Sequence, residues 1–234
     1  MSGSSGVRRV LVIDVGGRRV KIRLGAGEEV RKRDSGADFS AAQMAEVVLE
    51  LAEGWRFDAI SMGFPGPVRD GRPAAEPVNL GAGWIAFDYE GAFQRPVKIV
   101  NDAAMQALGS YDGGRMLFLG LGTGLGSAMV LDGIVQSMEL AHLPYRKERT
   151  FEDYVGRRGL DRRGRKKWSS SVEDIVARLS AALLPDYVVL GGGNAKKLEA
   201  LPERSRLGSN LNAFVGGQRL WGHDTSDRDA DAPA

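Results

Sequence analysis

In the first hundred residues, short apolar runs alternate with glycine- or proline-rich turns. Residues 7–15 are rich in Val, Leu and Ile and alternate little, which is typical of a strand buried on both faces, and residues 20–24 can return as its hairpin partner. Apolar positions recur at helical spacing within residues 41–54, and the apolar runs 59–64 and 97–100 predict two further strands. The pattern indicates an α/β unit that opens with a hairpin.

The second half of the chain repeats this order. Residues 116–121 and 127–131 read as a hairpin around a glycine-rich turn. Residues 172–184 have a helical pattern, and the strand expected at 187–190 runs into three glycines. Two related α/β lobes with a cleft between them would explain the duplication.

Composition narrows the class of protein. The chain has 234 residues, 43% of them hydrophobic and 26% charged, which is ordinary for a soluble globular protein. Its 32 Lys and Arg nearly balance 30 Asp and Glu, which argues against a nucleic-acid binder held by a global positive field. There is no cysteine, so disulfides and cysteine-ligated zinc are excluded. No apolar run reaches membrane-spanning length and residues 1–6 lack the apolar core of a signal peptide, so a cytoplasmic protein without membrane contact is expected.

The sequence FLGLGTGLGS at residues 118–127 is the strongest chemical signal. Glycines allow backbone N–H groups to approach a phosphate closely, and the Thr123 hydroxyl adds a donor. A tight turn alone would explain such a run equally well. Three other polar or glycine-rich segments follow apolar runs, at 14–17, 101–103 and 191–193. Because four such segments occur in one chain, a phosphate site is favoured over a simple turn.

Seven segments, in order, resemble those of the ROK sugar kinases of the actin-like ATPase superfamily, most nearly the polyphosphate-dependent glucokinases. They are IDVGG (13–17), GFPGPV (63–68), NL (79–80) with Trp84, VNDA (100–103), LGTGLGSA (121–128), ELAH (139–142) and LGGG (190–193) followed by Lys196 and Lys197. The resemblance covers residues 10–217. Its specificity comes from the order and spacing of the whole set.

The resemblance implies a two-lobed actin-like (ribonuclease-H-like) α/β fold with the active site between the lobes. It places the N-terminal lobe at residues 7–110 and the C-terminal lobe at 111–206, with a late helix over 207–221 packing back on the first lobe. The polar ends, 1–6 and 222–234, are expected to be disordered. The activity implied is phosphoryl transfer from polyphosphate or ATP to the 6-hydroxyl of glucose or a similar hexose, with Mg²⁺ as cofactor and a homodimer as a possible assembly.

Asp102 is the candidate catalytic residue. A sugar kinase needs a carboxylate within hydrogen-bond reach of the accepting hydroxyl, and in the family the aspartate of the Asn-Asp-Ala segment fills this role. Taken locally, the same residue could instead cap a helix that begins at Ala103.

The resemblance also assigns the sugar and phosphate contacts. Asn101, Glu139 and His142 would bind sugar hydroxyls, with Asn79 in the same set, although a lone histidine is more often structural. Asp14 would hold Mg²⁺ through water, but an Asp in a glycine-rich turn can be purely structural. The groups expected around the donor are Asp14, Gly16, Gly17, Lys21, Gly122, Thr123, Gly124, Gly191, Gly192 and Gly193.

The chain departs from the family pattern at several points. Arg18 and Arg19 replace small or hydroxyl residues, and could either clamp phosphate or block the pocket. Ala141 replaces a glycine, and a second sugar-binding glutamate is left to Glu148 or Glu152 by position alone. These departures keep open a catalytically degenerate sugar- or phosphate-binding sensor as the alternative function.

Residues 145–168 form a basic segment. Ten Lys and Arg stand there against four acidic residues. Such a run could follow a polyanion such as polyphosphate, or could be only a solvated helix face. A nucleic-acid binder is the least favoured reading, because no helix-turn-helix or aromatic stacking pattern accompanies the basic residues.

Overall fold

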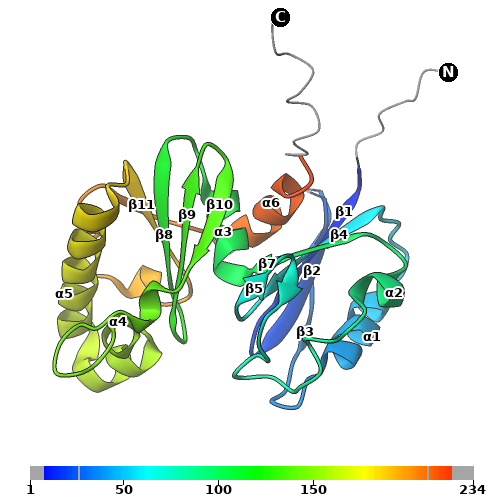
Figure 1. Ribbon diagram of the computed structural model, residues 1–234, viewed down its shortest axis with the longest axis horizontal. Helices are drawn as coiled ribbons and strands as arrows, with labels where there is room; N and C mark the ends of the chain where they lie inside the picture. Colours follow the sequence, from blue (N-terminus) through cyan, green and yellow to red (C-terminus); the bar gives the residue numbers. More distant parts are fainter. Residues whose placement is uncertain (1–7, 26, 210, 223–234) are drawn as a thin grey trace, which may run out of the picture.

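The computed structural model describes residues 8–25, 27–209 and 211–222. The chain forms two lobes, each built on a five-stranded sheet (Figure 1). The sheet orders are β3-β2-β1-β4-β7 and β10-β9-β8-β11-β12, in which three antiparallel strands are followed by two parallel ones. The repeat expected from the sequence is therefore confirmed down to the strand order.

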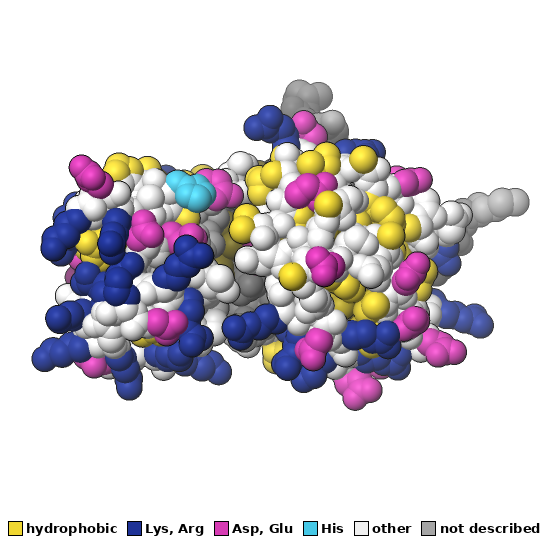
Figure 2. All heavy atoms as spheres, turned by 90° about the horizontal axis from the view of Figure 1, so that it is seen from below, with side chains coloured by type: hydrophobic (Ala, Val, Ile, Leu, Met, Phe, Trp, Pro, Cys, Tyr) yellow, Lys and Arg dark blue, Asp and Glu magenta, His cyan; other side chains and the backbone are white. Residues whose placement is uncertain are grey.

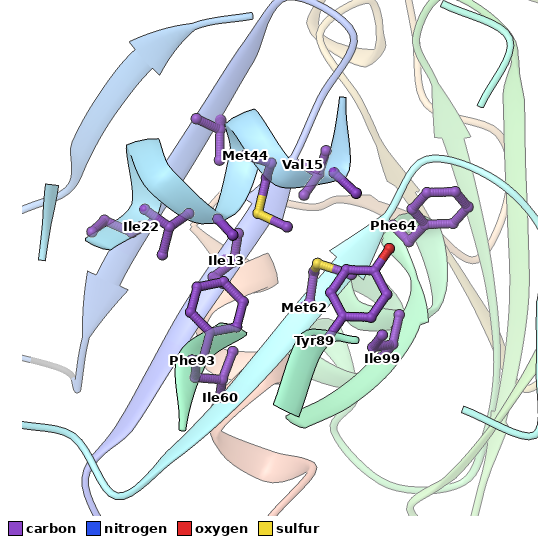
Figure 3. Close-up of a cluster of buried hydrophobic side chains, with 14 of the residues drawn as sticks. Ile13, Val15, Ile22, Met44, Ile60, Met62, Phe64, Tyr89, Phe93 and Ile99 are labelled. Atoms are coloured by element: carbon purple, nitrogen blue, oxygen red, sulfur yellow. The ribbon is translucent and has the colours of Figure 1, made fainter. Parts of the chain in front are cut away.

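The N-terminal sheet is covered on one face by two helices and carries a small hairpin at its edge. Its elements are β1 (Val10–Val15), β2 (Arg19–Leu24), β3 (Arg31–Asp34), α1 (Ala41–Leu51), β4 (Ala59–Phe64), β5 (Val68–Arg69), β6 (Arg72–Pro73), α2 (Tyr89–Phe93) and β7 (Val97–Asn101). In Figure 3, Ile13, Ile22 and Met62 point from the sheet toward Met44 of α1 and Phe93 of α2. This burial of apolar side chains is the main stabilising contribution to the lobe.

The C-terminal sheet begins with a longer hairpin and is flanked by one long helix. Its elements are β8 (Arg115–Leu121), β9 (Leu125–Leu131), β10 (Ile134–Met138), a 3₁₀ turn (Leu140–His142), α4 (Phe151–Val155), α5 (Arg157–Leu183), β11 (Tyr187–Gly191), a second 3₁₀ turn (Ala195–Lys197) and β12 (Ser205–Leu207). Trp168 of α5 is fully buried and donates a hydrogen bond to the Val155 carbonyl, 2.8 Å away.

Helices α3 (Asp102–Ser110) and α6 (Asn212–Arg219) lie between the two sheets (Figure 1). They cross at glycines: a Cβ at Gly109 or at Gly216 would collide with the backbone of the other helix. The second face of β1 is buried here, because Val10 and Val12 pack with Met105 and Phe214. Helix α3 thus contacts both lobes, and its N-terminus is held at their junction.

Several predicted boundaries were wrong. The helix expected over 172–184 begins at Arg157, and the helix expected over 207–221 spans only Asn212–Arg219, because Ser205–Leu207 pairs with β11 as strand β12. The strand expected over 127–131 begins at Leu125. The strand expected from residue 7 begins at Val10, and the disorder expected at 1–6 and 222–234 falls, apart from Gly222, outside the described residues.

Among the described helices, none combines the length and the apolarity needed to cross a bilayer.

Candidate functional site

Asp102 stands at the first position of α3, where the two lobes meet. The helix is capped by its neighbour: Asn101 Oδ1 accepts from the N–H groups of Ala103 and Ala104, at 2.9 and 3.3 Å. Asp102 Oδ1 accepts from the Ala103 N–H at 2.8 Å, the backbone N–H of Asp102 itself also acts on the carboxylate, and no other described residue donates a hydrogen bond to it. Since capping falls to Asn101, the local reading of Asp102 as the helix cap is wrong, and one carboxylate oxygen is left for other chemistry.

The environment of Asp102 disfavours its charged form. Burial raises the pKa of Asp102 to about 7, and the charge of Asp14 and then that of Glu139 add to the effect, while backbone N–H donors oppose it. The two acidic neighbours come from different lobes, Asp14 from β1 and Glu139 from the segment after β10. A carboxyl with a pKa near neutrality is suited to accept a proton at physiological pH.

Asp14 lies on β1 beside Asp102 and is nearly buried. Its Oδ2 accepts from Lys21 Nζ at 2.8 Å, and the two residues are direct partners in the β1–β2 pairing. Described residues contain no group of three or more Asp, Glu or His that could enclose a metal ion. Two neighbouring carboxylates nevertheless fit Mg²⁺, which binds through one or two carboxylates and takes its remaining ligands from water and phosphate.

The tip of the β1–β2 hairpin is exposed and tightly turned. Gly17 lies against Asn79, since a Cβ at Gly17 would be 3.3 Å from the Asn79 Cβ, and the Gly16 N–H donates to the Arg19 carbonyl at 3.0 Å. Arg19 Nε donates to Asp34 Oδ1 at 2.7 Å. The Arg18 guanidinium is exposed and makes no hydrogen bond or ion pair with the described residues.

The turn of the β8–β9 hairpin is held by backbone hydrogen bonds and by Glu152. The Gly122 N–H is already used, because it donates to the Gly124 carbonyl at 3.1 Å. Glu152 Oε2 accepts from the Leu125 N–H at 3.1 Å and lies so close to Gly124 that any Cβ there would collide with it. The structure thus puts Glu152 at the glycine loop, whereas Glu148 lies in an exposed turn with a positive φ of 57°.

The three glycines after β11 pack on that loop. Gly192 has a φ of +81°, and a Cβ there would be 2.5 Å from the Leu121 carbonyl oxygen. Asn194 Nδ2 donates to the Gly122 carbonyl at 2.9 Å, which ties the two turns together. Gly193 faces open space. Sequence reasoning missed Asn194, although its place directly after the glycines was a usable signal.

Glu139 and His142 lie side by side, as their spacing predicted. His142 Nε2 is 3.9 Å from Glu139 Oε2, and their side chains are 74% and 62% exposed. The amide of Asn101 is largely committed to the protein, since Nδ2 donates to the Gly66 carbonyl at 3.0 Å while Oδ1 caps α3. Of the predicted sugar ligands, Glu139, His142 and the exposed Asn79 therefore keep polar atoms that form no hydrogen bond with the described residues, whereas Asn101 does not.

The predicted residues form two groups that meet at the N-terminus of α3. Asp14, Lys21 and Asp102 form the first, and the loop 122–124 with Glu152 and Gly192 forms the second. They are joined through β9, because a Cβ at Gly126 would be 2.8 Å from the Ala103 Cβ. Seen from below in Figure 2, the surface is hollowed between the two lobes.

A cavity of about 260 Å³ lies at the opposite end of α3. The two arginines that line it form hydrogen bonds with carbonyls at the end of α3. Arg219 donates to the Leu108 and Tyr111 carbonyls, and Arg206 donates to the Ser110 carbonyl. This cavity is a structural feature of the C-terminus of α3, separate from the Asp102 site.

The basic segment covers the outside of the C-terminal lobe, on α4, α5 and the turn before them. Figure 2 shows Lys and Arg side chains crowded over this lobe. Some are used internally: Arg157 pairs with Asp161, and Arg162 and Arg165 donate to backbone carbonyls. Five are exposed and form no side-chain hydrogen bond or ion pair within the described part of the chain: Lys147, Arg149, Arg158, Lys166 and Lys167.

Comparison with known proteins agrees with the resemblance seen in the sequence. The chain is 28% identical over 231 residues to a polyphosphate glucokinase of Mycobacterium tuberculosis, covering 84% of this chain and 82% of that one. It is 25% identical to a polyphosphate glucokinase of Mycobacterium leprae, covering 85% and 67%. No protein-family model matches the chain.

Solved structures show the same fold. An inorganic polyphosphate/ATP-glucomannokinase from Arthrobacter sp. strain KM superposes with a TM-score of 0.78 at 22% identity, covering 92% of this chain and 100% of that one. A ROK family glucokinase from Streptomyces griseus, solved with glucose and AMPPNP, gives a TM-score of 0.68 at 16% identity and covers 91% and 98%. The predicted two-lobed actin-like α/β fold and the resemblance to polyphosphate glucokinases are confirmed.

Proposed function

We propose that this chain, a relative of the polyphosphate glucokinases, is a sugar kinase that transfers a phosphoryl group from polyphosphate or ATP to the 6-hydroxyl of glucose or a similar hexose. The observation that carries the proposal is the placement of Asp102. Its carboxylate lies at the junction of the lobes, is spared from capping α3, and has a pKa raised to about 7 by burial and by charges from both lobes.

Asp102 would act as the general base. The proton of the sugar hydroxyl passes to the free Asp102 oxygen, a new P–O bond forms to the sugar, and the bond between the transferred phosphorus and the rest of the donor breaks. Phosphoryl transfer otherwise depends on positioning and on neutralising charge. The donor's phosphates would lie between the β1–β2 and β8–β9 hairpins, where Lys21 supplies a cation and Thr123 a hydroxyl.

Asp14 is the residue we assign to Mg²⁺. When bound, the ion would neutralise charge on the phosphates. Lys21 holds the Asp14 carboxylate in place through its 2.8 Å ion pair.

Glu139 and His142 are the main sugar ligands in this proposal, and Glu152 joins them as the second glutamate. Glu152 is favoured over Glu148 because its carboxylate lies at the turn of the β8–β9 hairpin, whereas Glu148 lies in an exposed turn. Asn79 would contact the sugar or donor from beside Gly17.

Polyphosphate is the donor that the charge distribution favours. The five unpaired cations of the basic segment lie on the lobe that carries the glycine loop, and a polyanion longer than ATP could reach them. We also propose that the protein acts in the cytoplasm.

The test is a steady-state assay of sugar phosphate formation with glucose or mannose as acceptor and with polyphosphate or ATP, each with Mg²⁺, as donor. We expect turnover with glucose and a higher kcat/KM for polyphosphate than for ATP. Sugar binding without product from any donor would identify the protein as a sensor and would overturn the kinase assignment.

A further inference from the structure

The β1–β2 hairpin carries an ion pair that none of the roles above uses. Arg19 Nε lies 2.7 Å from Asp34 Oδ1, and the two residues are direct partners in the β2–β3 pairing. Their side chains are 53% and 81% exposed. Exposed pairs of this kind contribute little to stability, so a stronger ligand can displace one partner at small cost.

Arg19 faces the same side of the sheet as the catalytic carboxylates. Side chains alternate along a strand, so Arg19 shares a face with Lys21, and Val20 and Ile22 are buried on the opposite face. Lys21 is the partner of Asp14 across the hairpin. Two residues of extended chain span about 7 Å, so Arg19 stands one step from Lys21 toward the hairpin tip.

That side of the sheet is the one that faces α3. Asp14 pairs with Gly63 on the neighbouring strand, and residues paired in this way project to the same face. A Cβ at Gly63 would meet the Met105 side chain and would be 3.5 Å from the Asp102 Cα. Asp102, Asp14, Lys21 and Arg19 therefore follow one another along a single surface, from the base toward the hairpin tip.

The backbone of the hairpin tip is fixed while the Arg19 side chain is free to exchange partners. Ser35 N–H donates to the Arg18 carbonyl at 2.9 Å, and Ser35 Oγ donates to the Gly16 carbonyl at 2.9 Å. A guanidinium carried on a fixed backbone can bind a phosphate through two parallel hydrogen bonds, and such contacts are stronger than a single exposed ion pair.

We infer that Arg19 is a donor-binding residue that leaves Asp34 to bind the donor's phosphate chain beyond the transferred group, and that Asp34 competes with the donor for it. The inference rests on the proposed kinase function for the orientation of the donor. It also answers the question that the sequence left open: the arginine on the face toward α3 is held at the edge by Asp34 instead of blocking the pocket.

The experiment compares four variants with the wild type: Arg19→Ala, Asp34→Asn, the double variant and Arg33→Ala. Arg33 is a matched control, because it forms another exposed ion pair, with Glu50, on the opposite face of the same sheet, where the two side chains are 48% and 60% exposed. Two readouts are measured, the KM for polyphosphate at saturating glucose and the dissociation constant of inorganic tripolyphosphate by titration calorimetry. Melting temperatures of all variants check that they are folded.

Arg19→Ala should raise the polyphosphate KM and the tripolyphosphate dissociation constant roughly tenfold or more, with the KM for glucose unchanged. Asp34→Asn should lower both donor constants, because Arg19 no longer has to leave a carboxylate. Most of that gain should vanish in the double variant, since the benefit acts through Arg19. Arg33→Ala should match the wild type.

Equal donor constants for Arg19→Ala and Arg33→Ala would overturn the inference. An Asp34→Asn gain of the same size with and without Arg19 would overturn it too, because Asp34 would then act only as a repelling charge. Failure of the proposed function has a different signature: the wild type would bind tripolyphosphate but form no sugar phosphate, and the calorimetric comparison would still test Arg19.

Discussion

The two hairpins that face each other across the lobes share a topology and differ in chemistry. The β1–β2 hairpin carries Asp14, Arg18, Arg19 and Lys21, four charged side chains within eight residues. The β8–β9 hairpin has no charged residue in its turn, and its shape is set by close backbone contacts, such as Gly192 against Leu121. The two hairpins therefore share a backbone path but differ in what they present: the β1–β2 hairpin carries charged side chains, and the β8–β9 hairpin presents closely packed backbone.

Asp102 is the point where charges from both lobes act on one carboxylate. Asp14 of the first hairpin is the larger charge effect on the Asp102 pKa, and Glu139, which follows the second hairpin along the chain, is the smaller one. The N-terminal lobe thus makes the larger contribution to the electrostatics of Asp102, and the C-terminal lobe the smaller one.

Short of removing the Asp102 carboxylate itself, the largest expected effect is on the pH dependence of catalysis. A general base works only when deprotonated, and the pKa of Asp102 is raised to about 7, so kcat/KM should fall about tenfold per pH unit below that value and level off above it. A pH profile of initial rates from 5 to 9 measures this directly. A flat profile down to pH 5 would show that Asp102 is not the titrating base.

The next effect concerns the close packing of Gly192 against the β8–β9 hairpin. Gly192→Ala should cost about 2 kcal/mol or more in the free energy of unfolding, since a side chain is strained at a φ of +81° and would meet the Leu121 carbonyl. Gly193→Ala is the matched control, because its side chain would enter open space. Urea unfolding of both variants measures the difference, and equal losses would mean that the close contact is unimportant.

A smaller effect is expected at the first hairpin, which a single side chain secures. Ser35→Ala removes the hydrogen bond from Oγ to the Gly16 carbonyl and should cost about 1 kcal/mol in the free energy of unfolding. The same urea experiment measures it. A loss equal to that of Gly192→Ala would contradict the contrast between the hairpins.

The smallest effect separates the contributions of Asp14 and Glu139 to the raised pKa of Asp102. Asp14→Asn should lower the pKa of Asp102 more than Glu139→Gln does, because Asp14 is the stronger of the two charges that raise it. A carbon NMR titration of the Asp102 carboxyl in each variant gives the order. The reverse order would place the main electrostatic control of the base in the C-terminal lobe.

The sequence predicted the elements with strong apolar signals and missed those with polar surfaces. The apolar run 59–64 matches β4 to the residue, whereas β3 reads Arg-Lys-Arg-Asp and has no apolar alternation to reveal a strand. The first turns of α5 were missed for the same reason: they are basic and bury only Gly159 and Leu160 before the Gly164 kink.

In the site, spacing predicted the proximity of Glu139 to His142. The sequence could not predict which polar side chains already form hydrogen bonds within the protein. Which of Glu148 and Glu152 lies at the glycine loop depended on how α4 packs against that loop. Asn101 matched a sugar-binding motif, yet its amide caps α3 and reaches Gly66. Such commitments arise from tertiary contacts between segments far apart in sequence.

The central claim is that the Asp102 carboxylate takes the proton of the sugar hydroxyl, and Asp102→Asn tests it most directly. The variant keeps the size of the side chain, so the dissociation constant for glucose, measured by calorimetry, should stay within about twofold of the wild type. Turnover with polyphosphate should fall by roughly 10²–10⁴-fold, the usual contribution of a general base. Turnover near the wild-type value with intact glucose binding would contradict the account.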